Sequence, residues 1–256
     1  MLRSIIIAFS MYSRIPMPKV EWNEKNMRYS LCFFPLVGVV IGFCELGCYY
    51  VLNALSVSRI TMAAFMTVLP ILISGGIHMD GFLDTVDAKS SFKPMEEKLK
   101  ILKDPHTGAF AVIYAIVYLL VTFGLYYEIT KEGLAVMAAG YVYERILSGY
   151  SVVSLKKAKR DGTAAAFADA AKQEEKWINN VIFPVEFLIC NIVLCIINPV
   201  YGGACIVTAL LTYWYYRNMS YKVFGGVTGD MAGYFLQVCE LMMLIAVILT
   251  EKLLMG

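Results

Sequence analysis

Three aspartates, Asp80, Asp84 and Asp87, are spaced i, i+4, i+7 in the polar segment between His78 and Asp104. On a helix this spacing places their carboxylates on one stripe, within about 60° of one another. Carboxylates on one stripe repel each other unless a positive charge lies between them. A hard divalent cation such as Mg²⁺ takes oxygen ligands of this kind, and substrate phosphates usually complete its shell. The spacing therefore predicts a magnesium site that handles a phosphate-bearing substrate.

A solvated turn at a helix end is the alternative explanation for this stripe. Asp80 alone can cap a helix N-terminus, but a cap does not account for Asp84 and Asp87. Asp is a poor helix former, and like charges four residues apart destabilise a helix. A metal-binding role explains these unfavourable choices better than solvation does. Asp104, just before the next apolar run, can add a fourth carboxylate from a facing helix, and Lys103 beside it can meet a phosphate.

Two other groups of polar residues are candidates for function. The segment Gly225–Gly233 places several glycines around Thr228 and Asp230, which allows close backbone approach to a phosphate or an amide group. A bare loop turn is the alternative there. Glu144 and Arg145 lie within an apolar run, where ionisable side chains are costly and often functional. A purely structural pair is equally compatible with the sequence.

The composition indicates that membrane helices position these residues. Of the 256 residues, 59% are hydrophobic and 16% are charged, with a mean hydropathy of +0.64. Soluble domains contain about 45–50% apolar and about 25% charged residues, so we expect an all-α, polytopic integral membrane protein. A net charge of +2 without a basic run interleaved with aromatics argues against nucleic acid as a partner.

Apolar runs long enough to cross a bilayer predict about seven transmembrane helices. They are Ser30–Leu55, Ser58–Ile77, Gly108–Tyr127, Gly133–Leu155, Asn180–Asn198, Gly202–Tyr216 and Met231–Thr250. The sixth is short, and the acidic stripe follows the second directly. We expect one integral membrane domain over residues 1–256, with an active-site segment at 78–107.

The distribution of basic residues orients these spans. Of the 22 lysines and arginines, only Arg59, Lys131 and Lys252 fall on one side of the membrane, and Arg145 falls within a span. The others lie in the N-terminal segment and in alternate loops on the opposite side. The positive-inside rule then places the N-terminus, the long loops and the active site in the cytoplasm.

The segment Gly75–Ala88, with its His-x-Asp-Gly-x-x-Asp-x-x-Asp core, resembles the signature of the cobalamin-5′-phosphate synthase family, also called adenosylcobinamide-GDP ribazoletransferases. Five more stretches match in order and extend the resemblance over most of the chain. They are Ser13–Pro16, Phe34–Gly38, Lys100–Gly108, Lys159–Gly162 and Gly229–Gly233.

The resemblance implies a Mg²⁺-dependent phosphotransferase of the prokaryotic cytoplasmic (inner) membrane. Its substrates would be adenosylcobinamide-GDP and α-ribazole or its 5′-phosphate, and GMP would leave. The chemistry needs charge neutralisation and alignment. The resemblance implies three kinds of site residue: metal ligands, a general base that is either His78 or Asp87, and side chains that bind phosphate or other parts of the substrates. The expected ligands are Asp80, Asp84, Asp87 and Asp104, and the expected substrate contacts are Arg14, Lys103, Arg160, Thr228 and Asp230. The sequence leaves open whether the protein forms a homo-oligomer.

Two rival functions remain. A CDP-alcohol phosphotransferase that makes phospholipid shares the chemistry, but the Ala-Arg of its motif is absent after Asp80-Gly81. A non-catalytic transporter would place acidic residues at mid-membrane depth. Glu45, Glu144, Glu186 and Glu240 keep that second alternative open. The nucleotide released distinguishes all three, because the phospholipid enzyme makes CMP and a transporter makes neither CMP nor GMP.

Overall fold

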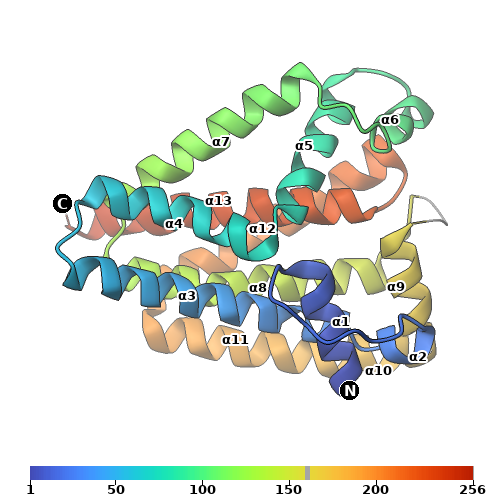
Figure 1. Ribbon diagram of the computed structural model, residues 1–256, viewed down its shortest axis with the longest axis horizontal. Helices are drawn as coiled ribbons and strands as arrows, with labels where there is room; N and C mark the ends of the chain where they lie inside the picture. The colour runs from blue at the N-terminus through green and yellow to red at the C-terminus, as the bar shows by residue number, and fades with distance from the viewer. Residues whose placement is uncertain (159–161, 256) are drawn as a thin grey trace.

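The computed structural model describes residues 1–158 and 162–255, and this part of the chain is helical (Figure 1). It contains no strand within those ranges, and its one β-type contact is an isolated bridge between Lys157 and Val227. The expected all-α fold is therefore confirmed. Seven helices of 15 to 27 residues account for most of the mass. They are α3 (Phe34–Ala54), α4 (Arg59–Ser74), α7 (Ala109–Glu128), α8 (Lys131–Ser154), α11 (Phe183–Ile197), α12 (Pro199–Phe224) and α13 (Gly229–Met255).

Most of these helices run along the long axis of the molecule, whereas α7 diverges from them (Figure 1). The central helix is α8, which packs against α3, α11, α12 and α13. Its buried face includes the charged pair Glu144 and Arg145. Because protein surrounds α8, it does not need the uniformly apolar surface that lipid contact demands.

Four segments of the described chain are long and apolar enough to cross a membrane, or five if α4 and the next helix form one broken span. They are 24–54, 109–128, 163–197 and 229–254. The composition and these helices define a membrane protein. The count of seven spans and the cytoplasmic N-terminus stay predictions.

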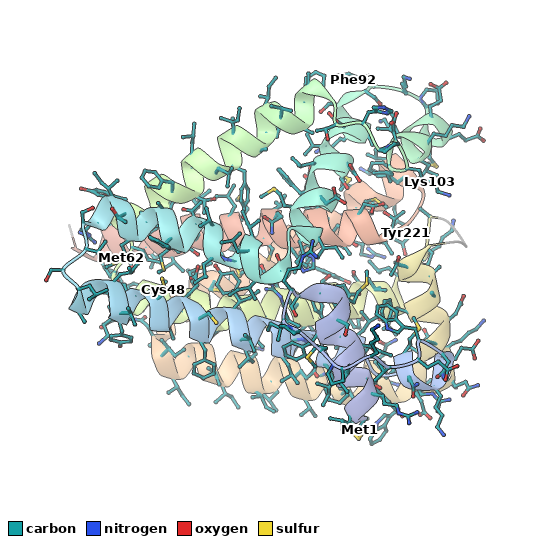
Figure 2. The ribbon with its side chains drawn as sticks, viewed as in Figure 1. Met1, Cys48, Met62, Phe92, Lys103 and Tyr221 are labelled. Carbon is teal, nitrogen blue, oxygen red and sulfur yellow. The ribbon has the colours of Figure 1, made fainter. Side chains whose placement is uncertain are left out.

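The short elements gather at one end of the bundle. They are α1 (Leu2–Tyr12), α2 (Glu24–Met27), α5 (Ile77–Ser90), α6 (Met95–Ile101), α9 (Thr163–Ala171), α10 (Glu175–Trp177), the 3₁₀ turns Leu31–Phe33 and Lys172–Glu174, and the π-helical turn Ile178–Ile182. Figure 2 shows Lys103 and Tyr221 toward this end, and Cys48 and Met62 at the opposite end. The segments with the candidate chemistry therefore share one end of the molecule.

The acidic helix α5 does not continue the direction of α4. The two helices meet at an angle of 94°. Gly75 and Gly76 make this corner, with φ angles of 69° and 77° that are unfavourable for residues with a β-carbon. The corner turns α5 across the end of the bundle, where it packs against α13 (Figure 1).

The helix that contains the short sixth apolar run is longer than that run. Helix α12 continues past Tyr216 to Phe224 and ends at Gly225, which has a φ angle of 76°. Arg217 and Lys222 ended the apolar run in the sequence, but charged residues near a helix end do not stop the helix itself. At its start, the side chain of Asn198 caps α12 by accepting from two backbone amides at 3.0 Å.

The crossing of α5 and α13 depends on glycine. A β-carbon at Gly81 would lie 2.6 Å from the backbone oxygen of Asp230, and one at Gly233 would lie 3.0 Å from that of His78. The two backbones therefore touch, and this contact sets the position of the acidic stripe relative to the start of α13.

We expect Gly81→Ala to push α5 away from α13 and lower both thermal stability and activity. Overpacking of this kind costs about 1–3 kcal/mol. The matched control is Gly47→Ala in α3, where a β-carbon meets no atom within 4 Å. Thermal unfolding in detergent should show a lower midpoint for Gly81→Ala only. Equal midpoints for the two variants would contradict the close crossing.

Candidate functional site

Helix α5 presents its residues to different neighbours. His78 is 4% exposed, and its Nε2 has no hydrogen-bond partner within the described ranges. Its ring stacks on Tyr12 of α1 with a centroid distance of 5.9 Å and lies 5.6 Å from the ring of Phe34. Asp80, half a turn further, is exposed. One end of α5 therefore offers a buried imidazole and an accessible carboxylate.

Two adjoining cavities lie at the start of α13, and α5 lines the first of them. The first, of about 170 Å³, is lined by His78 and Asp80 together with apolar residues of α1, α3, α8 and α13. The second, of about 200 Å³, is lined by Lys103, Lys157 and Thr228. Asp230 lines both cavities and marks their shared edge. Predicted residues that are far apart in the sequence thus surround one continuous site.

The carboxylates around this edge repel one another. Asp84 lies within electrostatic reach of Asp80, Asp87 and Asp230, and all three disfavour its ionised form. Asp230 was expected to contact substrate, but its position brings it into the acidic group as well. Such a group attracts a cation.

Asp87 has a second role that the stripe did not predict. Its two carboxylate oxygens accept the backbone amides of Gly108 at 2.5 Å and Ala111 at 2.9 Å, so it caps the N-terminus of α7. A β-carbon at Gly108 would lie 2.6 Å from one of these oxygens, which explains the glycine there. Asp87 lines neither cavity.

The other predicted residues lie at different distances from the cavities. Asp104 is exposed and accepts hydrogen bonds from the amide and ring of His106, which lower the pKa of the carboxyl below its ordinary value. Arg14 packs its side chain over Gly75 and donates its backbone amide to Ile73 at 2.8 Å. Neither of them lines a cavity. Arg160 lies outside the described residues.

Two loops hold the second cavity together. The amide of Val227 donates to Lys156 at 2.9 Å, and the amide of Ala158 donates back to Val227 at 3.0 Å. This bridge sets Lys157 beside Thr228. The hydroxyl of Thr228 accepts the amide of Met231 at 3.3 Å and so caps the long helix α13. A cation and a helix N-terminus at one cavity make an anion site.

Lys157 was missed in the sequence because it stands in a run of basic residues and looks like its exposed neighbour Lys156. Burial distinguishes the two and lowers the pKa of Lys157 to about 8, while Glu175 and Asp169 oppose the shift. Its ammonium donates to the carbonyl of Leu155 at 2.5 Å. The glycines at 225 and 226 were the only sequence signal of a tight approach there.

We expect anion binding at this cavity to weaken above pH 8. The amine of Lys157 attracts phosphate only while it is protonated. The affinity of the cavity for an anion is therefore full below the Lys157 pKa of about 8 and falls as pH rises through that value. One lost proton gives at most about a tenfold decrease per pH unit. Equilibrium dialysis of GDP between pH 7 and 9.5 measures the effect. Lys157→Met should abolish this loss of GDP affinity with rising pH, whereas Lys156→Met should keep it. An unchanged loss of affinity in Lys157→Met would exclude Lys157 as its source.

A charged network fills the bundle beneath the first cavity. Arg145, 1% exposed, contacts Glu144 at 2.5 Å and Glu240 at 3.8 Å. Glu240 also accepts hydrogen bonds from Tyr118 and Gln237 at 3.3 Å each. This supports the structural interpretation of the Glu144–Arg145 pair, since each charge has a partner.

The acidic group fits a divalent cation in its chemistry. Within residues 1–158 and 162–255, no three His, Cys, Asp or Glu side chains form a group that could hold a metal alone. Mg²⁺ usually takes only one or two carboxylates and completes its shell with substrate phosphates and water. Asp80 and Asp230 both line the first cavity, Asp84 is within electrostatic reach of both, and Asp230 also lines the cavity that contains the lysines. A cation held jointly with a phosphate group is compatible with this arrangement.

The fold and site define a helical membrane protein with an acidic and phosphate-compatible site at one end of its bundle. The family model of cobalamin-5-phosphate synthase matches residues 4–248. The chain therefore belongs to the cobalamin-5-phosphate synthase family, as the sequence resemblance predicted.

Curated relatives agree with this assignment. An adenosylcobinamide-GDP ribazoletransferase of Lachnoclostridium phytofermentans is 46% identical over 250 residues, which cover 98% of this chain and 95% of that protein. The enzyme of the same name from Clostridium botulinum strain Alaska E43 is 30% identical, with coverage of 94% and 95%. One from Geobacillus sp. strain WCH70 is 30% identical, with coverage of 88% and 87%. No solved structure matches the chain.

Proposed function

We propose that the protein transfers the adenosylcobinamide-phosphate group of adenosylcobinamide-GDP to α-ribazole or α-ribazole 5′-phosphate. A ribose hydroxyl of the acceptor attacks the phosphorus that bears the cobinamide. The bond from that phosphorus to GMP breaks, and the new bond joins the two halves of the cobalamin nucleotide loop. The family membership and the names of its curated relatives support this proposal.

The two cavities carry the proposal in the structure. The lysine-lined cavity suits the diphosphate, because Lys103, Lys157 and the N-terminus of α13 can balance its charge. The first cavity opens beside it at Asp230 and suits the acceptor. An attack across this shared edge would leave the departing GMP on the side of the lysines.

A magnesium ion would neutralise charge on the diphosphate as the bond to GMP breaks. Asp80, Asp84 and Asp230 would hold it together with substrate oxygens, and ligand roles for Asp87 and Asp104 remain part of the prediction. The proton of the attacking hydroxyl needs an acceptor. We favour His78 over Asp87, because His78 lines the acceptor cavity and its Nε2 has no hydrogen-bond partner in the described part of the chain, whereas Asp87 is hydrogen-bonded to α7.

The released nucleotide separates this proposal from its rivals. We expect purified protein in detergent to release GMP from adenosylcobinamide-GDP only when α-ribazole or its 5′-phosphate is present. Excess chelator should abolish the release and added Mg²⁺ should restore it. Release of CMP from a CDP-alcohol instead would favour the phospholipid enzyme. Chelator-resistant GMP release would overturn the metal requirement alone.

We further propose that the enzyme lies in the bacterial cytoplasmic membrane with this site facing the cytoplasm. The basic residues are concentrated in the N-terminal segment and in the alternate loops that contain the site segments, and this distribution supports the orientation. A single cysteine introduced at Phe92, which is 91% exposed, tests it in a variant whose native cysteines are replaced. It should react with an impermeant thiol reagent in inverted vesicles and stay protected in right-side-out vesicles. The reverse pattern would refute the orientation.

A further inference from the structure

The first cavity has the size of a small flat ring. Its volume is about 170 Å³. For comparison, an engineered apolar cavity of about 150 Å³ binds benzene. A corrin macrocycle, with its four linked five-membered rings, is several times too large. The group that enters must therefore be one or two fused rings.

The chemistry of its walls is that of an aromatic-lined slot. Tyr12 and Phe34 lie with ring centroids 4.2 Å apart, and His78 stacks on Tyr12. Leu31 and Leu236 complete an apolar interior, and both are at most 2% exposed. Aromatic rings pack well against such a surface.

The cavity has a distinct inner end and mouth. Its inner residues Phe34, Leu236 and Ser148 are almost fully buried, whereas Asp80 and Thr163 are exposed. A ligand that places a ring inside would thus present its polar part to the carboxylates at the mouth. His78 also lines this cavity, and its buried Nε2 has no hydrogen-bond partner among the described residues.

We infer that this cavity binds the heterocyclic base of the acceptor nucleoside and leaves its ribose at the mouth, beside Asp80 and Asp230. The inference rests on the proposed function. The base of α-ribazole is a benzimidazole, an apolar bicyclic ring with one free ring nitrogen. Guanine would bury several hydrogen-bonding groups against walls that are mainly apolar, and buried groups without partners are unfavourable. The corrin lies outside the cavity.

Filling the cavity should change the KM for one substrate and not for the other. Val152 lines it from α8 and is 5% exposed, so Val152→Phe places a ring in the slot. We expect the KM for α-ribazole to rise about tenfold or more, while the KM for adenosylcobinamide-GDP stays within about twofold. The matched control is Val153→Phe on the same helix, because Val153 is 8% exposed and lines neither cavity. It should leave both constants unchanged.

An equal rise in both KM values, or a rise for adenosylcobinamide-GDP alone, would overturn the assignment. Leu236→Phe tests the opposite wall if Val152→Phe does not fold. Equilibrium dialysis of the wild type against α-ribazole or free benzimidazole needs no turnover. Binding competed by guanosine would contradict the inference, whereas binding without any GMP release would support the cavity and refute the proposed reaction.

Discussion

Asp80→Asn should lower the rate of GMP release by about 10²–10³-fold, which is the loss found when one preorganised electrostatic contact to a transition state is removed. The reason is that this carboxylate lines the first cavity together with Asp230, which marks the edge shared with the lysine-lined cavity proposed to hold the diphosphate. An amide of the same shape keeps the packing but loses the negative charge that holds a cation. The rate at saturating Mg²⁺ and both substrates measures the effect.

The same substitution should not destabilise the protein. Asp80 is exposed and repels Asp84, so removing its charge relieves that repulsion. The thermal midpoint should stay equal or rise, which separates loss of chemistry from loss of fold. Glu97→Gln is the matched control, because Glu97 lies on α6 outside both cavities. An activity of Asp80→Asn within threefold of wild type would remove Asp80 from the metal site.

Arg145→Met should cost about 3–5 kcal/mol of stability, the penalty for breaking a buried ion pair. Arg145 is the positive partner of both Glu144 and Glu240 in the bundle core, and Glu144 is fully buried. Methionine fills similar volume but leaves the carboxylates without a counter-charge. Its effect should appear in thermal or denaturant unfolding in detergent.

A second substitution tests whether charge is the cause. The double variant Glu144→Gln with Arg145→Met should recover part of the loss, because one uncompensated charge is gone. Lys93→Met is the control for a surface pair, since Lys93 and Glu97 are both about half exposed. It should change stability by at most about 1 kcal/mol. If Arg145→Met were no more destabilising than Lys93→Met, the network would have no structural role.

Local patterns predicted the helices that are uniform in character. The apolar run Gly108–Tyr127 became α7 (Ala109–Glu128), displaced by a single residue. The corner at Gly75 and Gly76 was harder to predict, because glycine allows a left-handed conformation without requiring it. The direction of α5 is fixed by its contact with α13, and no spacing within α5 contains that information.

In the candidate site too, local sequence patterns identified individual residues but could not predict which of them packing brings together. Spacing identified Asp80, the family resemblance identified His78, and the glycine-rich stretch identified Asp230, yet only the packing of α5 on α13 joins them around one cavity. Lys157 could not be separated from Lys156 without the bridge to Val227. The bonds from Asp87 to α7 depend on residues 21 and 24 positions away, beyond the reach of helical periodicity.

The most direct test of the central claim follows both products of one reaction. Wild-type protein is incubated with adenosylcobinamide-GDP, α-ribazole and Mg²⁺, and GMP and the corrin product are quantified together. The account predicts equal amounts of GMP and of a corrin enlarged by the nucleoside, with neither product when α-ribazole or Mg²⁺ is omitted. Folded protein that forms neither product, or GMP without the joined corrin, would contradict the proposed transfer.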